Sequence, residues 1–319
     1  MKKILNTTHF EGYLWGHDLQ IKVTKAAAKN PGVEFISGTV QILTDEDGLN
    51  IVPINYRYVV EKTKAGKDNL TYKSLFNIMN STNATYQDVG VAAMKLRADT
   101  TIGLNDFYNQ ENELISYKIN DGGFIHILTS GQTFGSERNR FEVDMLITGT
   151  QLKEADEEHD KPAMVVVKGA TFNFMGSLLP IELVVKNDGG RQYFEDLGAT
   201  TSEPVFMKVW GKVVSTTVET ETSEESAFGG PSVKITTRNI REWEITGAAA
   251  TPYDFGVDGV LTDAEVKEAM GKRETFLADT KTSHDTWMKN KNATAANATP
   301  TGVPAGTPQT SATGKPYVF

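Results

Sequence analysis

The residues best suited to a chemical role form a short alternating run at positions 206–212. A period of two divides this run into two faces, and one face consists of Phe206, Lys208, Trp210 and Lys212. Because buried faces rarely carry two lysines, we expect Met207 to face the core and the lysines to lie in solvent. An exposed ring between cations suits single-stranded nucleic acid, whose bases stack on rings and whose phosphates attract ammonium groups. The alternative is that Trp210 packs under a loop and the lysines are ordinary surface residues.

Aromatic and basic residues recur together on other expected strands. Arg238 and Arg241 lie beside Trp243 on the last expected hairpin. In the first half of the chain, Tyr56 and Tyr58 share a face with Ile54, so core packing is as good an interpretation as base stacking. The remaining candidate DNA-binding residues are Trp15, Tyr56, Arg57, Tyr58, Lys95, Arg97, Arg238 and Arg241.

Catalytic and metal-binding patterns are absent from the sequence. There are no cysteines, so zinc–thiolate sites and cysteine nucleophiles are excluded. The five histidines are scattered without metal-ligand spacing, and no phosphate-binding glycine motif or serine-nucleophile motif occurs. The sequence therefore predicts no enzyme activity, no cofactor and no metal.

Charge and hydropathy limit the possible partners. The 319 residues carry a net charge of −9, which argues against a large uniform basic surface of the kind that binds duplex DNA. No apolar run is long enough to span a bilayer, so we expect no membrane partner. Two lysines near the start are not followed by an apolar stretch, which predicts no export signal and a location in the cytoplasm of the host cell.

The chain shows an internal repeat in its strand pattern. Residues 10–12 align with 141–143, and residues 36–39 align with 167–170 at the same offset of 131. Further matches follow in the same order: 52–54 with 179–181, 93–96 with 206–209, and 124–129 with 242–246. Modules of this size with hairpins and one helix favour a mainly β fold of two tandem OB-like barrels, each with five to six strands. A β-sandwich is the competing fold.

The domain organisation follows from this repeat. We expect a first OB-like module at 1–135, a second at 136–255, a C-terminal helix at 256–289 and a disordered tail at 290–319. The helix should begin at a capping box formed by Thr262 and Glu265, with a break near Gly271. The tail is rich in Ala, Thr, Asn, Pro and Gly and cannot bury enough apolar surface to order itself.

Taken together, these features resemble the single-stranded DNA-binding proteins of bacteriophage replication modules. The resemblance rests on Gly38 and Gly169 in the repeated strands, on the Lys-Trp-Lys stripe at 208–212, on the segment 237–248 and on the terminal Phe319. It implies that Tyr317 and Phe319 recruit replication partners. In that family the tail is acidic and competes with DNA, whereas residues 290–319 contain no acidic residue, which puts such competition in doubt.

The leading hypothesis is a sequence-tolerant single-stranded DNA-binding protein that supports phage replication or recombination, with homo-oligomerisation as an option. A virion structural protein of a head, tail or baseplate explains the repeat and the acidic surface equally well. A sugar-binding β-sandwich is a third interpretation, which the missing export signal disfavours.

Overall fold

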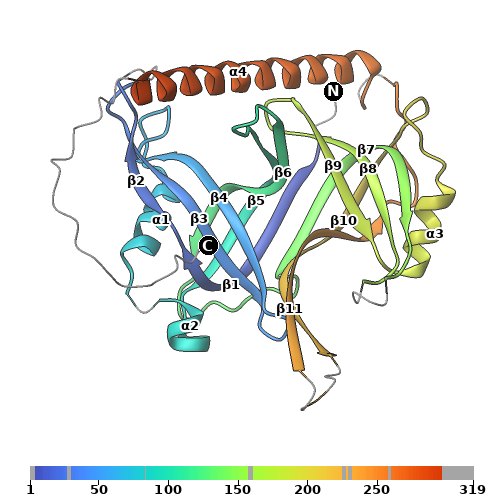
Figure 1. Ribbon diagram of the computed structural model, residues 1–319, viewed down its shortest axis with the longest axis horizontal. Helices are drawn as coiled ribbons and strands as arrows, with labels where there is room; N and C mark the ends of the chain where they lie inside the picture. The colour runs from blue at the N-terminus through green and yellow to red at the C-terminus, as the bar shows by residue number, and fades with distance from the viewer. Residues whose placement is uncertain are drawn as a thin grey trace.

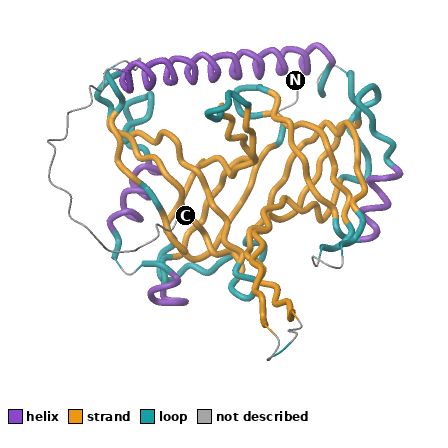
Figure 2. Tube along the Cα trace, viewed as in Figure 1, coloured by secondary structure: helices purple, strands orange, loops and turns teal. Residues whose placement is uncertain are grey.

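The computed structural model describes residues 4–26, 30–82, 84–156, 161–224, 228, 232–257 and 260–296. Its strands form two closed barrels that lie side by side, with one long helix crossing above both (Figures 1 and 2). The predicted tail residues Tyr317 and Phe319 lie outside the described residues.

The first barrel closes a sheet of five strands on itself. Neighbouring strands run in the order β1–β3–β4–β6–β5 and back to β1. The β4–β6 pair is parallel and the other pairs are antiparallel. Helix α1 (Leu70–Asn80) connects β4 to β5. The remaining elements are β1 (Asn6–His17), β2 (Gln20–Val23), β3 (Glu34–Asp45), β4 (Asn50–Val60), α2 (Tyr86–Val89), η1 (Gly90–Ala92), β5 (Lys95–Tyr108) and β6 (Leu114–Ile127).

The second barrel repeats these connections strand for strand. Its order is β7–β8–β9–β11–β10 and back to β7, with β9 and β11 parallel and helix α3 between β9 and β10. Closure with this order is the Greek-key barrel of the OB fold. The predicted pair of tandem OB-like barrels is therefore confirmed, and the sandwich is excluded. The elements are β7 (Asn139–Lys153), β8 (Met164–Phe172), β9 (Leu178–Val185), α3 (Asp188–Asp196), β10 (Val205–Glu224) and β11 (Ser232–Ala248).

Two glycines at matching positions let another backbone segment approach closely in each barrel. A Cβ on Gly38 would lie 2.8 Å from the Asp18 carbonyl oxygen, and a Cβ on Gly169 would lie 2.2 Å from the Leu146 carbonyl oxygen. Both glycines lie on the second strand of their barrel. Their repetition in the sequence thus has a steric cause.

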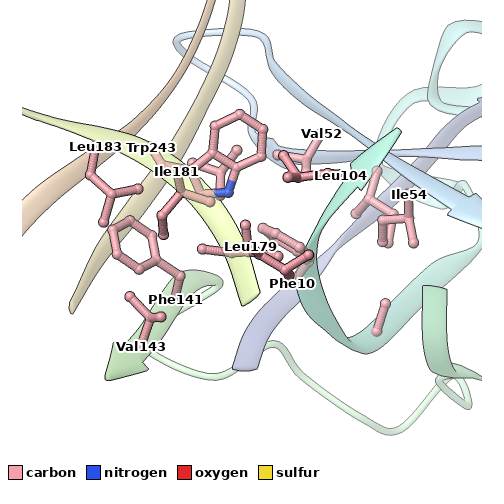
Figure 3. Close-up of a cluster of buried hydrophobic side chains, with 14 of the residues drawn as sticks. Phe10, Val52, Ile54, Leu104, Phe141, Val143, Leu179, Ile181, Leu183 and Trp243 are labelled. Carbon is pink, nitrogen blue, oxygen red and sulfur yellow. The ribbon is translucent and has the colours of Figure 1, made fainter. Parts of the chain in front are cut away.

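The two barrels share one hydrophobic core. Strands β1 and β7 pair across the junction, and a single cluster of buried side chains runs through both barrels. Figure 3 shows Trp243 among core residues of both barrels, with Val52 from the first and Ile181 from the second. The predicted boundary after residue 135 falls between β6 and β7. The division of the chain into two modules at this boundary stays a prediction.

Helix α4 (Asp263–Ala296) begins at the predicted capping box and runs on through Gly271 without a break. The Thr262 hydroxyl accepts a hydrogen bond from the Glu265 amide at 3.3 Å, and the Glu265 carboxylate accepts one from the Thr262 amide at 3.0 Å. The first part of α4 packs on the second barrel through Ala269. Further along, the helix contacts β5 of the first barrel.

Among the described residues, no helix is both long and apolar enough to cross a membrane. The same part of the chain contains no group of three or more His, Cys, Asp or Glu side chains that could hold a metal ion.

Candidate nucleic-acid interface

Two pockets that share lining residues lie at the junction between the barrels, and we treat them as two parts of one groove. The first part has a volume of about 520 Å³ and lies between β3, β4 and β6 of the first barrel and β10 and β11 of the second. The second part has a volume of about 560 Å³ and lies over β8, β9 and β11. Lys118 and Arg241 line both parts. We call this combined surface the inter-barrel groove.

The groove uses equivalent strands of the two barrels. Its walls include the second and third strands of the first barrel, β3 and β4, and the second and third strands of the second barrel, β8 and β9. In OB folds, this face binds oligonucleotides and oligosaccharides. The two faces that OB folds commonly use for such ligands therefore open onto one surface.

The groove concentrates positive charge in an acidic chain. Three acidic side chains line it, Asp18, Glu182 and Glu242. Its basic side chains are Lys118, Lys153, Lys161, Lys186, Arg238 and Arg241. Since the whole chain carries a net charge of −9, this excess of cations is local. A groove lined with such an excess of cations attracts a phosphate backbone.

Some of these cations already have acidic partners. The Lys186 ammonium lies 2.6 Å from a Glu242 carboxylate oxygen, and the Lys161 ammonium lies 2.9 Å from Asp156. Arg241 is exposed and forms no ion pair within the described part of the chain. Arg241 and the likewise exposed Lys153 are therefore groove cations available to a phosphate.

Lys118 and Trp243 join the barrels at the point where the two parts of the groove meet. The Lys118 ammonium nitrogen lies 4.9 Å from the centroid of the Trp243 ring and donates a hydrogen bond to the Glu182 carbonyl oxygen. Burial lowers the pKa of Lys118 to about 8, against the opposing charges of Glu182 and Glu242. Trp243 itself is only 6% exposed. Its ring therefore supports the groove and offers no stacking surface.

Tyr117 is the accessible aromatic side chain of the groove. It is 50% exposed and lines the first part. Its hydroxyl accepts a hydrogen bond from the Asn105 amide at 2.7 Å, and its ring packs edge-on against Phe107 at 6.1 Å. Because these contacts hold the ring in place, Tyr117 can stack on a base with little loss of conformational freedom.

Two of the predicted site residues are buried; for Tyr56 this agrees with the alternative interpretation of core packing, and for Phe206 the expectation that it faces solvent was wrong. Tyr56 is 2% exposed within the core of the first barrel, where burial raises its pKa. Phe206 is fully buried. It points outward from its strand, as its alternation with Met207 predicts, but Tyr253 and the start of α4 cover it. That cover comes from a distant segment, which local alternation does not reveal.

The rest of the predicted stripe on β10 lies outside the inter-barrel groove. The Lys208 ammonium lies 2.6 Å from a Glu142 oxygen, and this contact lowers the pKa of Glu142. The Lys212 ammonium lies 3.9 Å from Glu244. Trp210 is half-buried and covers Gly247, where a Cβ would lie 2.5 Å from its indole nitrogen. The alternative interpretation of an ordinary surface fits these contacts better.

The first-barrel candidates are dispersed over several contacts. Arg57 pairs with Asp121 at 2.6 Å, and the Arg97 guanidinium donates to Glu11 at 2.5 Å. The other three rest on neighbouring rings: Trp15 on Tyr86, Tyr58 on Phe35, and Lys95 on Phe134. None of them lines the inter-barrel groove.

Of the predicted residues, Arg238 and Arg241 are the two that line the groove. Sequence reasoning missed Tyr117, Lys118, Lys153, Lys161 and Lys186. Tyr117 and Lys118 lie next to the hairpin between the fourth and fifth strands of the first barrel, one of the loops that OB folds use for binding. That position was the signal that could have identified them.

Comparison with known proteins places the chain in a family. A family model described as YorF matches residues 5–283. The chain belongs to the YorF family. The matched region of this YorF chain spans both barrels and the first part of α4. No curated protein matches the YorF chain.

One solved structure resembles this YorF chain in fold. It is a deletion mutant of the single-stranded DNA binding protein from Thermus aquaticus, with 13% sequence identity and a TM-score of 0.46. The similarity covers 80% of the YorF chain and 98% of that chain.

Proposed function

We propose that this YorF chain binds single-stranded DNA in the inter-barrel groove, without catalysing a reaction and with little sequence preference. The observation that carries the proposal is that the strand faces that OB folds use for binding, β3–β4 in the first barrel and β8–β9 in the second, both line one basic groove. A flexible strand can follow a groove that turns from one barrel to the next, whereas a stiff duplex cannot.

In the proposed complex, phosphates approach the second part of the groove and bases approach the first. Lys153 and Arg241 supply positive charge over the second barrel. Tyr117 supplies a ring for stacking over the first barrel. Neither contact depends on the identity of a base, which explains the expected tolerance of sequence.

The biological setting that we propose is phage DNA replication or recombination in the cytoplasm of a bacterial host. Replication proteins would be recruited through Tyr317 and Phe319, and the protein could act as a homo-oligomer. These parts of the proposal rest on the resemblance of the sequence to phage single-stranded DNA-binding proteins.

The test is fluorescence anisotropy of labelled oligo-dT with the full chain at two salt concentrations. We expect binding that weakens with salt, as phosphate contacts require. Arg241→Ala should weaken binding about threefold to tenfold and reduce the salt dependence by about one phosphate contact. Lys212→Ala is the matched control, because Lys212 is an exposed cation on the neighbouring strand outside the groove. Absence of binding at low salt would overturn the proposal and favour the virion structural protein.

A further inference from the structure

A second group of rings and cations lies on α4, away from the inter-barrel groove. Lys281, His284, Trp287 and Lys291 follow one another at intervals of three, three and four residues, which places them on one face of the helix. Tyr108 at the end of β5 joins this face. We call these five residues the α4 platform.

Contacts within the platform alternate between rings and cations. The His284 ring lies 6.0 Å from the Tyr108 ring and 6.0 Å from the Trp287 ring. The Lys281 ammonium lies 5.2 Å from the centroid of Tyr108, and the Lys291 ammonium lies 5.0 Å from the centroid of Trp287. These are cation–π distances. The neighbouring rings and cations hold Trp287 in place, although it remains 50% exposed.

The platform is attached to an element that also reaches the groove. The Lys281 ammonium donates to the Asn112 side chain at 2.5 Å in the turn between β5 and β6. Figure 1 shows the β5–β6 hairpin rising from the first barrel toward α4. Tyr117 on the same hairpin lines the groove, and its partner Phe107 is 40% exposed. Consecutive residues of a strand face opposite sides, so Phe107 and Tyr117 lie on one face of the hairpin and Tyr108 of the platform lies on the other. The tip of the hairpin, where Lys281 contacts Asn112, connects the two faces.

We infer that the α4 platform is a second contact for the single strand bound in the inter-barrel groove; this inference rests on the proposed function. A strand that extends past Tyr117 and around the tip of the hairpin reaches the platform and stacks a base on Trp287, while Lys291 faces its phosphates. Lys281 is already paired with Asp285 at 3.0 Å and holds the platform in place. Alternating rings and cations are the chemistry of single-strand binding. A short strand held in the groove does not reach the platform.

The test compares a short and a long oligo-dT on the full chain. Because an OB fold covers about 4–16 nucleotides, we would use oligonucleotides of about 8 and about 60 nucleotides. Trp287→Ala should weaken binding of the long oligonucleotide about tenfold and leave the short one unchanged, while Trp287→Phe keeps most of the affinity. Phe276→Ala is the control, since Phe276 is 43% exposed on the same helix but lies outside the platform.

Each outcome bears on the inference separately from the proposed function. Equal losses on both lengths would show that Trp287 acts through the fold, and no loss on the long strand would show that DNA does not touch it. Either result overturns the inference while the groove proposal survives. If Trp287→Ala instead weakens binding of a poly-glutamate peptide and spares DNA, the platform is a protein-docking surface and the inference is wrong. Failure of the unaltered protein to bind either oligonucleotide would remove both proposals.

Discussion

The ammonium group of Lys118 in the first barrel lies 4.9 Å from the ring centroid of Trp243 in the second barrel. This contact crosses the junction at the floor of the inter-barrel groove. It connects the packing of the barrels to the surface that we propose for DNA, because Trp243 belongs to the shared core and Lys118 lines both parts of the groove.

The first prediction is that DNA affinity falls as pH rises through about 8. Burial lowers the pKa of Lys118, so its charge is present below about 8 and lost above it. A nearby phosphate favours the charged form, so the midpoint in the complex should lie higher than in the free protein. Anisotropy titrations across this range should show a loss of about threefold to tenfold.

Lys118→Arg tests the origin of this pH dependence. The guanidinium stays charged over the whole range, so the loss near pH 8 should disappear. Lys212→Arg, at an exposed cation outside the groove, should keep the original profile. An unchanged profile in Lys118→Arg would mean that another group causes the loss.

The second prediction concerns stacking on Tyr117. Tyr117→Ala should weaken oligo-dT binding by about 1–3 kcal/mol, whereas Tyr117→Phe should bind nearly as well because the ring remains. Tyr58→Ala is a matched control: Tyr58 is 51% exposed, close to the 50% of Tyr117, but lies outside the groove. Similar losses in Tyr117→Ala and Tyr58→Ala would contradict stacking at Tyr117.

The third prediction concerns the close approach of strands at the repeated glycines. Gly169→Ala should lower the free energy of unfolding by at least about 1–3 kcal/mol, because its Cβ would lie 2.2 Å from the Leu146 carbonyl oxygen and the backbone must shift. Gly149→Ala in the same barrel is the control, since its Cβ would meet no atom within 4 Å. Urea denaturation of both variants compares them. Equal stabilities would contradict the closed geometry at Gly169.

The fourth prediction concerns the ion pair that fixes α4 to the first barrel. Two hydrogen bonds of 2.7 Å join the Arg273 guanidinium to the Asp106 carboxylate, whose side chain is only 1% exposed. Arg273→Met leaves that carboxylate buried without its partner and should cost about 3–5 kcal/mol of unfolding free energy. Lys272→Ala removes an exposed neighbour paired within the helix and should cost less than about 1 kcal/mol. If Arg273→Met and Lys272→Ala lower the stability by similar amounts in thermal denaturation, the Arg273–Asp106 pair does not anchor α4.

The barrels could be predicted from the sequence because their signals are local or repeated. Alternation in β9 places Ile181 and Leu183 in the core, and the Gly38 and Gly169 strands recur at a fixed offset. The capping box likewise marks the start of α4, and its two residues, Thr262 and Glu265, are only three positions apart in the sequence. Such patterns depend on neighbours along the chain, so they survive without knowledge of the tertiary structure.

The groove could not be predicted because it depends on how the barrels meet. Pairing of β1 with β7 brings Lys118 next to Trp243, and no local pattern specifies that contact. Local alternation on β10 also pointed to a different surface, whose binding of DNA stays a prediction. There, Glu142 neutralises Lys208, and the segment before α4 covers Phe206. Contacts with distant segments therefore determine whether these side chains are exposed and whether their charges are paired.

The most direct test of the central claim is to map where a single strand contacts the protein. Ultraviolet cross-linking of oligo-dT to the full chain, followed by mass spectrometry of the cross-linked peptides, reports these contacts by residue. Binding in the inter-barrel groove predicts cross-links at Tyr117 and in the segment around Arg241. Cross-links confined to the β10 surface around Lys208 and Trp210, with none at Tyr117 or Arg241, would contradict it.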